Sequence, residues 1–348
     1  MSRPVRAATV VFLALCVLLP ASATARLPAG FAGVVPQGPL SSSDLDRIGE
    51  VGLGLRVNVA WTSIEVRPGV YDFSALDAQI GAAADRGIEV LPMVYGTPAW
   101  LRPSAVHPPL GRHGLAAWHD FLFALVARYG HGGSFWESRE RRRPPRRWQL
   151  WIEPNFPNFW RPRPAPTAYA KLLHAGAAGV RAADRRARVV AAGLAPIERQ
   201  PPAWEFLRRL YRVPGFRVDA DLIALHPYST TVGLLAQRVE RMRAVMAAAG
   251  DARKPLLITE FGVASSSSIP TTMDRGPLGQ ARYLERAFAR LARERRWRVA
   301  GAYWYAFADN PTFDPGCQFC SYTGLFDTSG EAKPAWWALK RVLATATR

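Results

Sequence analysis

Lysine is scarce in this chain of 348 residues: only four of its 45 basic residues are lysine, and the formal net charge is +18. An arginine excess beside abundant alanine and proline is typical of a GC-rich genome, which is the origin we favour. The alternative is a surface for acidic partners, such as an anionic polysaccharide or nucleic acid. Because no nucleic-acid recognition motif accompanies the charge, we expect no nucleic-acid partner.

Long apolar runs are absent after the first 25 residues. Arg3 and Arg6 precede an apolar stretch over residues 7–19, and small residues then lead up to Ala25. This layout predicts a signal peptide over residues 1–25, because a membrane-spanning helix needs about 20 apolar residues. An uncleaved N-terminal anchor is the alternative. We therefore expect a secreted, monomeric chain of one domain, residues 26–348, with no membrane span.

Cysteine is also rare, with three residues in all. Cys16 belongs to the predicted signal peptide, whereas Cys317 and Cys320 form a C-Q-F-C pair near the end of the chain. Structural zinc takes four ligands, usually from two such pairs, and there is no second pair. An extracellular location favours a disulfide between Cys317 and Cys320. We expect no metal and no cofactor.

Short apolar segments alternate with longer segments of helical composition, which predicts βαβ units and a parallel sheet. The predicted strands are residues 31–35, 55–60, 88–95, 148–152, 188–194, 218–226, 255–260 and 298–305. The predicted helices are residues 41–52, 75–86, 114–130, 166–185, 201–212, 233–249, 277–295 and 334–345. Eight such units without a linker predict a single (β/α)8 barrel. An open doubly wound sheet is the alternative, but no G-x-G-x-x-G follows the first strand.

Two segments between these elements differ from the rest. Residues 139–147 (RERRRPPRR) precede the fourth predicted strand, so they belong to the N-terminal end of the barrel. We interpret them as a solvated loop, with a polyanion-binding patch as the alternative. Residues 306–333 follow the eighth strand, carry Phe313 and both late cysteines, and should lie at the C-terminal end, where barrel enzymes have their active sites.

Two glutamates end apolar strands on that catalytic face. Glu153 follows the fourth strand in W-Q-L-W-I-E-P-N, and Glu260 closes the seventh in P-L-L-I-T-E-F-G. A carboxylate at such a position is costly unless it is paired or functional. Hydrolysis of a glycosidic bond needs two carboxyl groups and no metal, so the pair predicts this chemistry. Structural ion pairs at the two strand ends are the alternative.

The neighbouring motifs resemble those of the retaining (β/α)8 glycoside hydrolases, most closely families 39 and 5, which include bacterial exopolysaccharide endoglycosidases. The matching segments are G-L-R-V-N-V-A-W-T-S-I-E-V-R-P-G-V-Y-D-F (54–73), G-T-P-A-W (96–100), I-A-L-H-P-Y (223–228), G-A-Y-W-Y-A-F (301–307) and G-L-F-D-T-S-G-E-A-K-P-A (324–335). The resemblance covers residues 30–345. It implies Glu153 as general acid/base and Glu260 as nucleophile.

The same resemblance implies a set of substrate-binding residues. Arg56 would orient the nucleophile, His226 and Tyr228 would line the sugar subsite and contact the nucleophile, and Trp304 would be the sugar-stacking floor. Aromatic faces suit the apolar faces of sugar rings, so we also place several tryptophans at the rim of the site. The full set of expected binding residues is Arg56, Trp61, Trp100, Asn155, Trp160, His226, Tyr228 and Trp304.

One position departs from the family pattern. The residue before the acid/base is usually asparagine, which hydrogen-bonds the sugar 2-hydroxyl, and here it is Ile152. The sequence thus predicts a secreted retaining glycosidase that acts on a β-linked poly- or oligosaccharide. A barrel that binds carbohydrate but has lost catalysis is the alternative, and Ile152 is the residue that favours it.

Overall fold

The structure, a computed structural model, describes residues 27–28, 30–197, 201–266, 270–312 and 317–344. The predicted signal peptide and Phe313 lie outside the described residues. Within the described part, no helix combines the length and apolar character needed to span a membrane.

Eight parallel strands form one sheet in the order β5-β4-β3-β2-β1-β8-β7-β6. Parallel bridges from Val190 to Leu222 and from Leu194 to Leu225 join β5 to β6 and close the sheet into a barrel. The predicted (β/α)8 fold is therefore confirmed. The strands are β1 Ala32–Val35, β2 Gly54–Ala60, β3 Val90–Tyr95, β4 Arg147–Ile152, β5 Arg188–Gly193, β6 Ile223–Leu225, β7 Leu256–Phe261 and β8 Val299–Tyr305.

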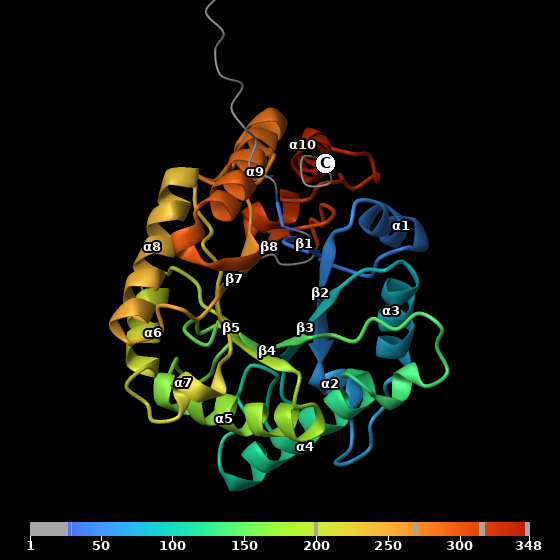
Figure 1. Ribbon diagram of the computed structural model, residues 1–348, viewed down its shortest axis with the longest axis vertical. Helices are drawn as coiled ribbons and strands as arrows, with labels where there is room; N and C mark the ends of the chain where they lie inside the picture. Colours follow the sequence, from blue (N-terminus) through green and yellow to red (C-terminus); the bar gives the residue numbers. More distant parts are fainter. Residues whose placement is uncertain (1–26, 29, 198–200, 267–269, 313–316, 345–348) are drawn as a thin grey trace, which may run out of the picture.

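Helices surround this barrel (Figure 1). The α-helices are α1 Ser42–Glu50, α2 Trp61–Ile64, α3 Ser74–Asp85, α4 Arg112–Tyr129, α5 Pro166–Ala183, α6 Ala203–Leu210, α7 Phe216–Asp219, α8 Val232–Ala248, α9 Gly276–Arg293 and α10 Pro334–Ala344. Three short 3₁₀ helices are η1 Ser134–Trp136, η2 Arg295–Trp297 and η3 Gln318–Tyr322. Each long helix turns a stripe of buried side chains toward the strands, as an amphipathic barrel helix must.

The core is continuous between the strands and the helix layer. Trp118 on α4, Trp151 on β4 and Trp160 in the following loop are all buried and meet edge to face. Such ring pairs bury large apolar areas in fixed orientations. This aromatic packing fixes the end of β4, where Glu153 emerges.

The sixth predicted strand is wrong in its extent. The sequence predicts residues 218–226, whereas β6 holds only Ile223–Leu225 and residues 216–219 form the short helix α7. Gly215 turns the chain into α7 with a φ of 88°. Asp221, in the same apolar stretch, uses its carboxylate to accept a hydrogen bond from Val189 N. The short helix α2 was not predicted.

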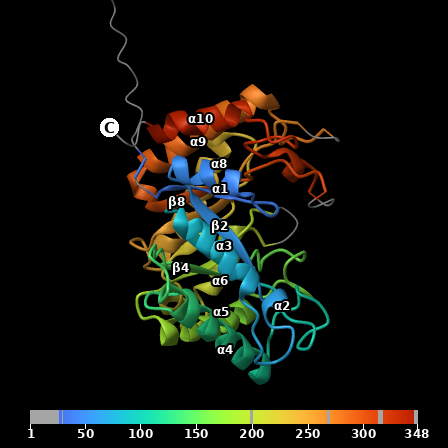
Figure 2. The ribbon, with the colours of Figure 1, turned by 90° about the vertical axis from the view of Figure 1, so that its right-hand side faces the viewer.

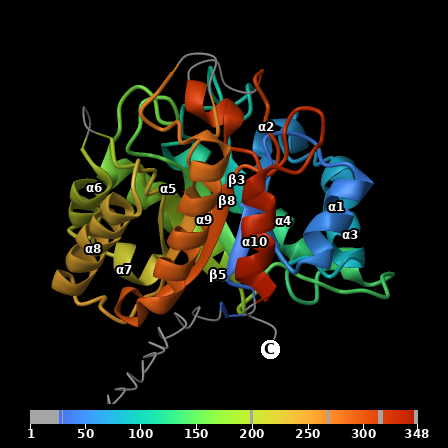
Figure 3. The same ribbon diagram turned by 90° about the horizontal axis from the view of Figure 1, so that it is seen from above.

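The two ends of the barrel carry different loops (Figures 2 and 3). The loops that follow the strands lie together at one end, which is at the right in Figure 2 and at the top in Figure 3. They include α2, η3 and the residues after β4. The loop between α4 and β4, residues 130–146, lies at the other end, as predicted for residues 139–147.

Candidate active site

Glu153 stands directly after β4 on an unusual backbone. Its φ is 38°, and that of Trp151, two residues earlier, is 75°. Residues other than glycine rarely adopt this left-handed backbone conformation, and bulky residues are outliers there. Glu153 N donates to Gly193 O at 3.1 Å, so β5 holds this turn in place. Strained backbone of this kind is concentrated at functional sites, where the surrounding structure maintains it.

His226, in the loop after β6, links the carboxyl groups. Its Nδ1 lies 2.6 Å from Glu153 Oε1 and 3.6 Å from Glu260 Oε2, while Nε2 lies 2.9 Å from Thr259 Oγ1. The imidazole is completely buried. A side chain on Gly193 would meet the ring, since an added Cβ would lie 2.0 Å from His226 Nε2. Glycine at this strand end is therefore required for the histidine to reach Glu153.

Glu260, near the end of β7, is held by two donors. Arg56 Nη1 donates to Oε1 at 2.6 Å, and Tyr228 OH donates to Oε2 at 3.0 Å. Arg56 in turn donates through Nε to Gln149 Oε1 at 3.0 Å, which fixes the plane of the guanidinium. Because Arg56 is 3 % exposed, its charge acts on Glu260 with little screening by water.

The two carboxyl groups have opposite pKa shifts. Burial raises the pKa of Glu153 above its ordinary value, and the repulsion of Glu260 adds to this, although His226 and Arg56 oppose it. Burial also raises the pKa of Glu260, but the charges of His226 and Arg56 outweigh it. Hydrogen bonds from Tyr228 and Arg56 act in the same direction, so the pKa of Glu260 lies below its ordinary value. Burial and Glu260 together keep the pKa of Tyr228 well above its ordinary value, so its hydroxyl remains a donor.

The two carboxyl groups lie close to each other. One oxygen of Glu153, one of Glu260 and a nitrogen of His226 all lie within 4.8 Å of one another. This spacing would also allow a metal ion. Each of the three already has a protein partner, however, and Arg56 supplies the positive charge next to Glu260. The donor set therefore fits proton transfer and attack by a carboxylate.

A cleft of about 1190 Å³ opens over the two glutamates. One wall comes from the β1–α1 loop and from α3, and the opposite wall from the loops after β4 and β5. Aromatic rings supply much of the lining, and Ile152 lies in the lining beside Glu153. The aromatic residues that line it are Tyr95, Phe156, Phe159, Tyr228, Tyr305 and Phe319. Such a mixture of rings with a few polar groups is typical of a ligand site.

The predicted tryptophans do not line this cleft. Trp61, Trp160 and Trp304 are at most 1 % exposed. Trp304 packs against Phe261 and donates through Nε1 to Thr323 O. The expectation that these rings stack on sugars is therefore wrong, because none of the three presents a face to the cleft. Successive side chains of a strand point to opposite faces, so Tyr305, the next residue, occupies the position expected for Trp304.

Trp100 and Asn155 have structural contacts in place of the expected ones. Trp100 is half-buried and donates to Glu65 O at 2.8 Å, away from the cleft lining. Asn155 is fully buried. Its amide bonds to Ala195 N, Ala195 O and Pro201 O, so it joins the loops after β4 and β5. Of the expected binding residues, Arg56, His226 and Tyr228 do gather around the two glutamates.

Sequence reasoning missed several lining residues. Two of them, Tyr95 and Tyr305, are the last residues of β3 and β8. Sequence reasoning also missed Gln149 on β4, which is fully buried and accepts a hydrogen bond from Arg56. A search for aromatic residues at strand ends would have found both tyrosines. Phe319, in contrast, comes from η3, and nothing in its local sequence indicates that it reaches the cleft.

The loop after β8 forms the third wall of the cleft. The structure joins Cys317 and Cys320 in a disulfide at its η3 turn. Gln37 Nε2 donates to Cys320 O at 2.7 Å, which ties the turn to the β1–α1 loop. The Phe319 ring meets the Tyr228 ring edge to face at 5.5 Å. This wall therefore supports the tyrosine that donates to Glu260.

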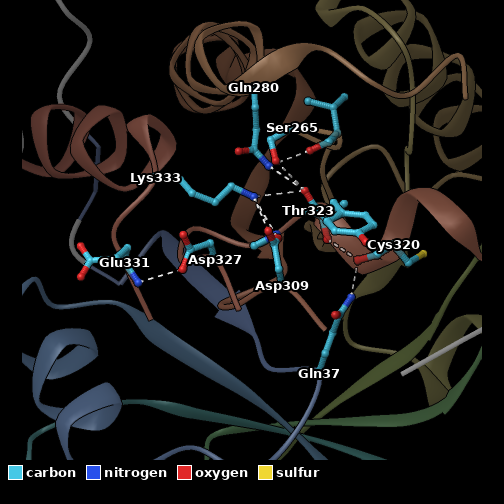
Figure 4. Close-up of polar contacts among 12 residues, drawn as sticks. Gln37, Ser265, Gln280, Asp309, Cys320, Thr323, Asp327, Glu331 and Lys333 are labelled. Carbon is cyan, nitrogen blue, oxygen red and sulfur yellow. Dashed lines mark hydrogen bonds and ion pairs between the residues drawn. The ribbon is translucent and has the colours of Figure 1, made fainter. Parts of the chain in front are cut away.

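A buried ion pair anchors the same loop (Figure 4). Lys333 Nζ lies 2.9 and 3.0 Å from the two oxygens of Asp309, and it donates to Tyr322 O at 3.2 Å. Ser265 N and Gln280 Nε2 donate to the same Tyr322 carbonyl. Tyr322 ends η3, so the contacts fix the segment that carries Phe319.

Comparison of the sequence with protein-family models and with curated proteins gives no match. Solved structures do match. A family 39 glycoside hydrolase from Bacteroides cellulosilyticus has a TM-score of 0.68 and 19 % identity, and the match covers 91 % of this chain. The chain spans 64 % of the length of that enzyme.

Two further structures extend the comparison. A monomeric β-xylosidase from Caulobacter crescentus has a TM-score of 0.64 and 21 % identity over 92 % of this chain and 70 % of its own. Xylanase 10B from Thermotoga maritima has a TM-score of 0.60 and 15 % identity over 91 % of this chain and 95 % of its own. The structural resemblance to glycoside hydrolases, which the motifs predict, is confirmed, and at these identities it establishes the fold.

Proposed function

We propose that this chain is a retaining glycoside hydrolase that cleaves O-glycosidic bonds in a β-linked poly- or oligosaccharide. Glu153 is the general acid/base and Glu260 the nucleophile. One observation carries the proposal: two carboxyl groups with opposite pKa shifts place oxygens within 4.8 Å beside a cleft. Retaining enzymes hold their carboxyl groups about 5–5.5 Å apart, whereas inverting ones need about 6.5–9.5 Å.

In the first step, an ionised Glu260 oxygen attacks the anomeric carbon and forms a glycosyl ester. The glycosidic C–O bond breaks, and the leaving oxygen takes the proton of Glu153. The raised pKa of Glu153 keeps that proton available, and the lowered pKa of Glu260 keeps the nucleophile ionised.

In the second step, Glu153 is a carboxylate and removes a proton from water. The water oxygen attacks the anomeric carbon, and Glu260 leaves as a carboxylate, which restores the enzyme. His226 orients Glu153, whereas Arg56 and Tyr228 stabilise the charge that returns to Glu260. The leaving glycosidic oxygen and the attacking water oxygen thus both exchange a proton with Glu153, on the same side of the sugar.

The cleft suits a substrate longer than one sugar. Its lining extends from Pro36–Leu40 and Ala75 on one side of the carboxyl pair to Phe156 and Pro196 on the other. Because the cleft continues on both sides of the carboxyl pair, we infer that the enzyme is endo-acting or directed at oligosaccharides. The rings of Tyr305 and Phe319 offer apolar surfaces for sugar faces.

The stereochemistry of the first product tests the mechanism. We expect proton NMR to show the anomeric configuration of the substrate in the first-formed sugar, before mutarotation. An activated 2-fluoro glycoside should label Glu260, detectable by peptide mass. An inverted product, or a label on a residue other than Glu260, would refute the assignment.

A second candidate is a barrel that binds carbohydrate without cleaving it. Ile152 favours it, because the chain lacks the usual asparagine next to Glu153. Calorimetric titration with defined β-linked oligosaccharides, followed by mass analysis of the same samples, separates the two. Binding without hydrolysis products by the wild-type protein supports the second candidate and contradicts the first.

We also propose that the enzyme acts outside the cytoplasm, on the basis of residues 1–25. N-terminal sequencing of protein expressed with this segment should find a mature chain that begins near residue 26 in the culture medium. Recovery of the intact chain in the membrane fraction would instead support an uncleaved anchor.

A further inference from the structure

The excess positive charge is distributed unevenly between the two ends of the barrel. At the catalytic end, basic and acidic side chains of the described loops nearly balance. The basic ones are Arg67, Arg102, Arg161, Arg163, Arg275 and Lys333. The acidic ones are Glu65, Asp72, Glu153, Asp274, Asp309, Asp327 and Glu331. The net charge of +18 therefore does not arise at the catalytic end.

Exposed arginines gather at the opposite end, in the loops that precede β4 and β5 and at the first residue of β5. We call this cluster the basic face, and its members are Arg141, Arg142, Arg143, Arg146, Arg185, Arg186 and Arg188. The two loops are neighbours, because Arg188 N donates to Arg146 O at 2.9 Å. Arg186 also contacts the His131 ring, which belongs to the first loop. The arginines therefore form one surface.

None of the arginines in the basic face forms an ion pair within the described part of the chain. Arg141 and Arg142 bond only to backbone carbonyl oxygens, and Arg186 bonds to a histidine. The acids beneath them have other partners: Asp85 pairs with Arg139, and Asp184 accepts the backbone N–H groups of His131 and Arg186. Glu137 and Glu140 are exposed in the same region, and the arginines outnumber them.

Codon bias, the origin we favour for the arginine excess, concerns the choice of arginine over lysine and not the position of these residues in the fold. Like charges held together repel one another, and this destabilises the folded state unless a partner supplies the opposite charge. Acidic side chains hold both loops in place through Arg139, His131 and the backbone of Arg186, while no acidic side chain among the described residues pairs with the exposed guanidinium groups. This arrangement is typical of a preformed anion-binding surface.

We propose that the basic face binds an anionic polysaccharide through its carboxylates. Planar guanidinium groups bond carboxylates in a bidentate manner. Residues 137–147 and 184–188 present no exposed aromatic or large aliphatic side chain, so they offer neither a stacking platform for bases nor an anchor for a bilayer. The choice of a polysaccharide rests in part on the proposed function, which places the enzyme among extracellular polysaccharides. Because the cleft lies at the other end, bound polymer leaves it open.

The test compares two matched double variants. Arg143→Gln/Arg146→Gln removes two charges from the basic face. Arg282→Gln/Arg286→Gln removes two exposed arginines of α9 that form no ion pair with any residue the structure describes. The probe is polygalacturonate, with neutral dextran as the reference, and the measurement is the Kd at about 50 mM and about 200 mM salt. Equal melting temperatures of wild type and variants establish that all are folded.

We expect wild type to bind polygalacturonate, not dextran, and to bind more weakly at the higher salt concentration. The basic-face variant should lose about tenfold in affinity, and the α9 variant less than about twofold. Equal losses in both variants, no binding by wild type, or tighter binding of duplex DNA or anionic lipid vesicles would overturn the proposal. Hydrolysis of a soluble neutral oligosaccharide should be the same in all three proteins. Absence of hydrolysis in wild type would instead count against the proposed glycosidase, and it would leave the binding result intact.

Discussion

Strands β4 and β7 each lead to a buried glutamate, yet the two strand ends surround their carboxyl groups differently. The end of β7 places Glu260 between the Arg56 guanidinium and the Tyr228 hydroxyl. The end of β4 places Glu153 against His226 and next to Ile152, and among the described residues no arginine is bonded to it. Both side chains are 7 % exposed, so burial alone does not distinguish them.

The difference lies in the neighbours and not in the type of residue. Burial raises the pKa of either carboxyl group, and only at Glu260 do positive charge and hydrogen-bond donors reverse this effect. In the proposed mechanism, two identical side chains thus acquire the roles of acid and nucleophile from their partners. The following variants exchange or remove those partners and the glutamates themselves.

Glu260→Gln should have the largest effect. The amide keeps the shape of the side chain but cannot attack the anomeric carbon, so we expect kcat/KM to fall by at least about 10⁴-fold. Steady-state hydrolysis of an aryl β-glycoside measures this. Glu240→Gln, an exposed glutamate on α8, is the control and should retain full activity. Comparable activity in both variants would exclude Glu260 as the nucleophile.

Glu153→Gln should show a smaller loss that depends on the leaving group. A substrate with a good leaving group needs no acid in the first step, but the second step still needs a base, so the glycosyl enzyme should accumulate. We expect a burst of one equivalent of aglycone and then a rate about 10²–10⁴-fold below wild type. Rapid-mixing absorbance measures both phases. A slow first phase without a burst would contradict the acid/base assignment.

The sequence predicts this pair well because strand ends are readable without a structure. An apolar strand that closes on a glutamate is a strong local signal, and the order of the motifs identifies Arg56, His226 and Tyr228 as their neighbours. The residues in these contacts are far apart in the sequence, but the closed barrel brings them together at one end. The fold converts strand order into proximity, so the predicted strands were sufficient to bring Glu153 and Glu260 together. The roles of Arg56, His226 and Tyr228 came from the resemblance to the retaining glycoside hydrolases.

The outer parts of the site could not be predicted in the same way. A shift of one residue along a strand moves a side chain from the cleft to the helix layer, which separates Tyr305 from Trp304. Asn155 looks like a ligand-binding residue in the sequence, but two loops use its whole amide. Phe319 depends on a turn fixed by Lys333 and Asp309, which no local pattern indicates.

Ile152→Asn would supply the donor that the end of β4 lacks. A hydrogen bond to the 2-hydroxyl strengthens in the transition state and is worth on the order of 2–4 kcal/mol, or roughly 30- to 1,000-fold in kcat. We expect this gain on plain β-glucosides and β-xylosides, and a loss on analogues whose 2-position is deoxy or acylated. Side-by-side kinetics of wild type and variant measure it.

The outcome for Ile152→Asn also identifies the role of the isoleucine. If the variant gains activity on plain sugars and wild type is active on 2-substituted ones, the result supports a specialised pocket. If the variant gains activity and wild type has none on any sugar, the result supports a carbohydrate-binding barrel. If wild type is already fast and asparagine adds nothing, another residue supplies the contact. Asn58 lines the cleft and is exposed, so it is the residue to test, whereas the Asn155 amide is already bonded.

Tyr228→Phe should have the smallest effect, and it acts on the pKa of Glu260. The hydroxyl donates to Glu260 Oε2 and so lowers the pKa of that carboxyl group. Loss of the donor raises the pKa, and because Glu260 acts in its ionised form, activity is then lost at a higher pH as the solution is acidified. We expect the acidic limb of the pH profile of kcat/KM to move up by about one unit, with about a tenfold loss below it. The phenylalanine ring keeps the contact with Phe319, so the wall of the cleft should remain in place.

Tyr283→Phe is the control for Tyr228→Phe, since its hydroxyl contacts Ser229 Oγ and neither glutamate, and it should leave the acidic limb unchanged. An unshifted limb in Tyr228→Phe would mean that Arg56 and His226 alone hold Glu260 ionised.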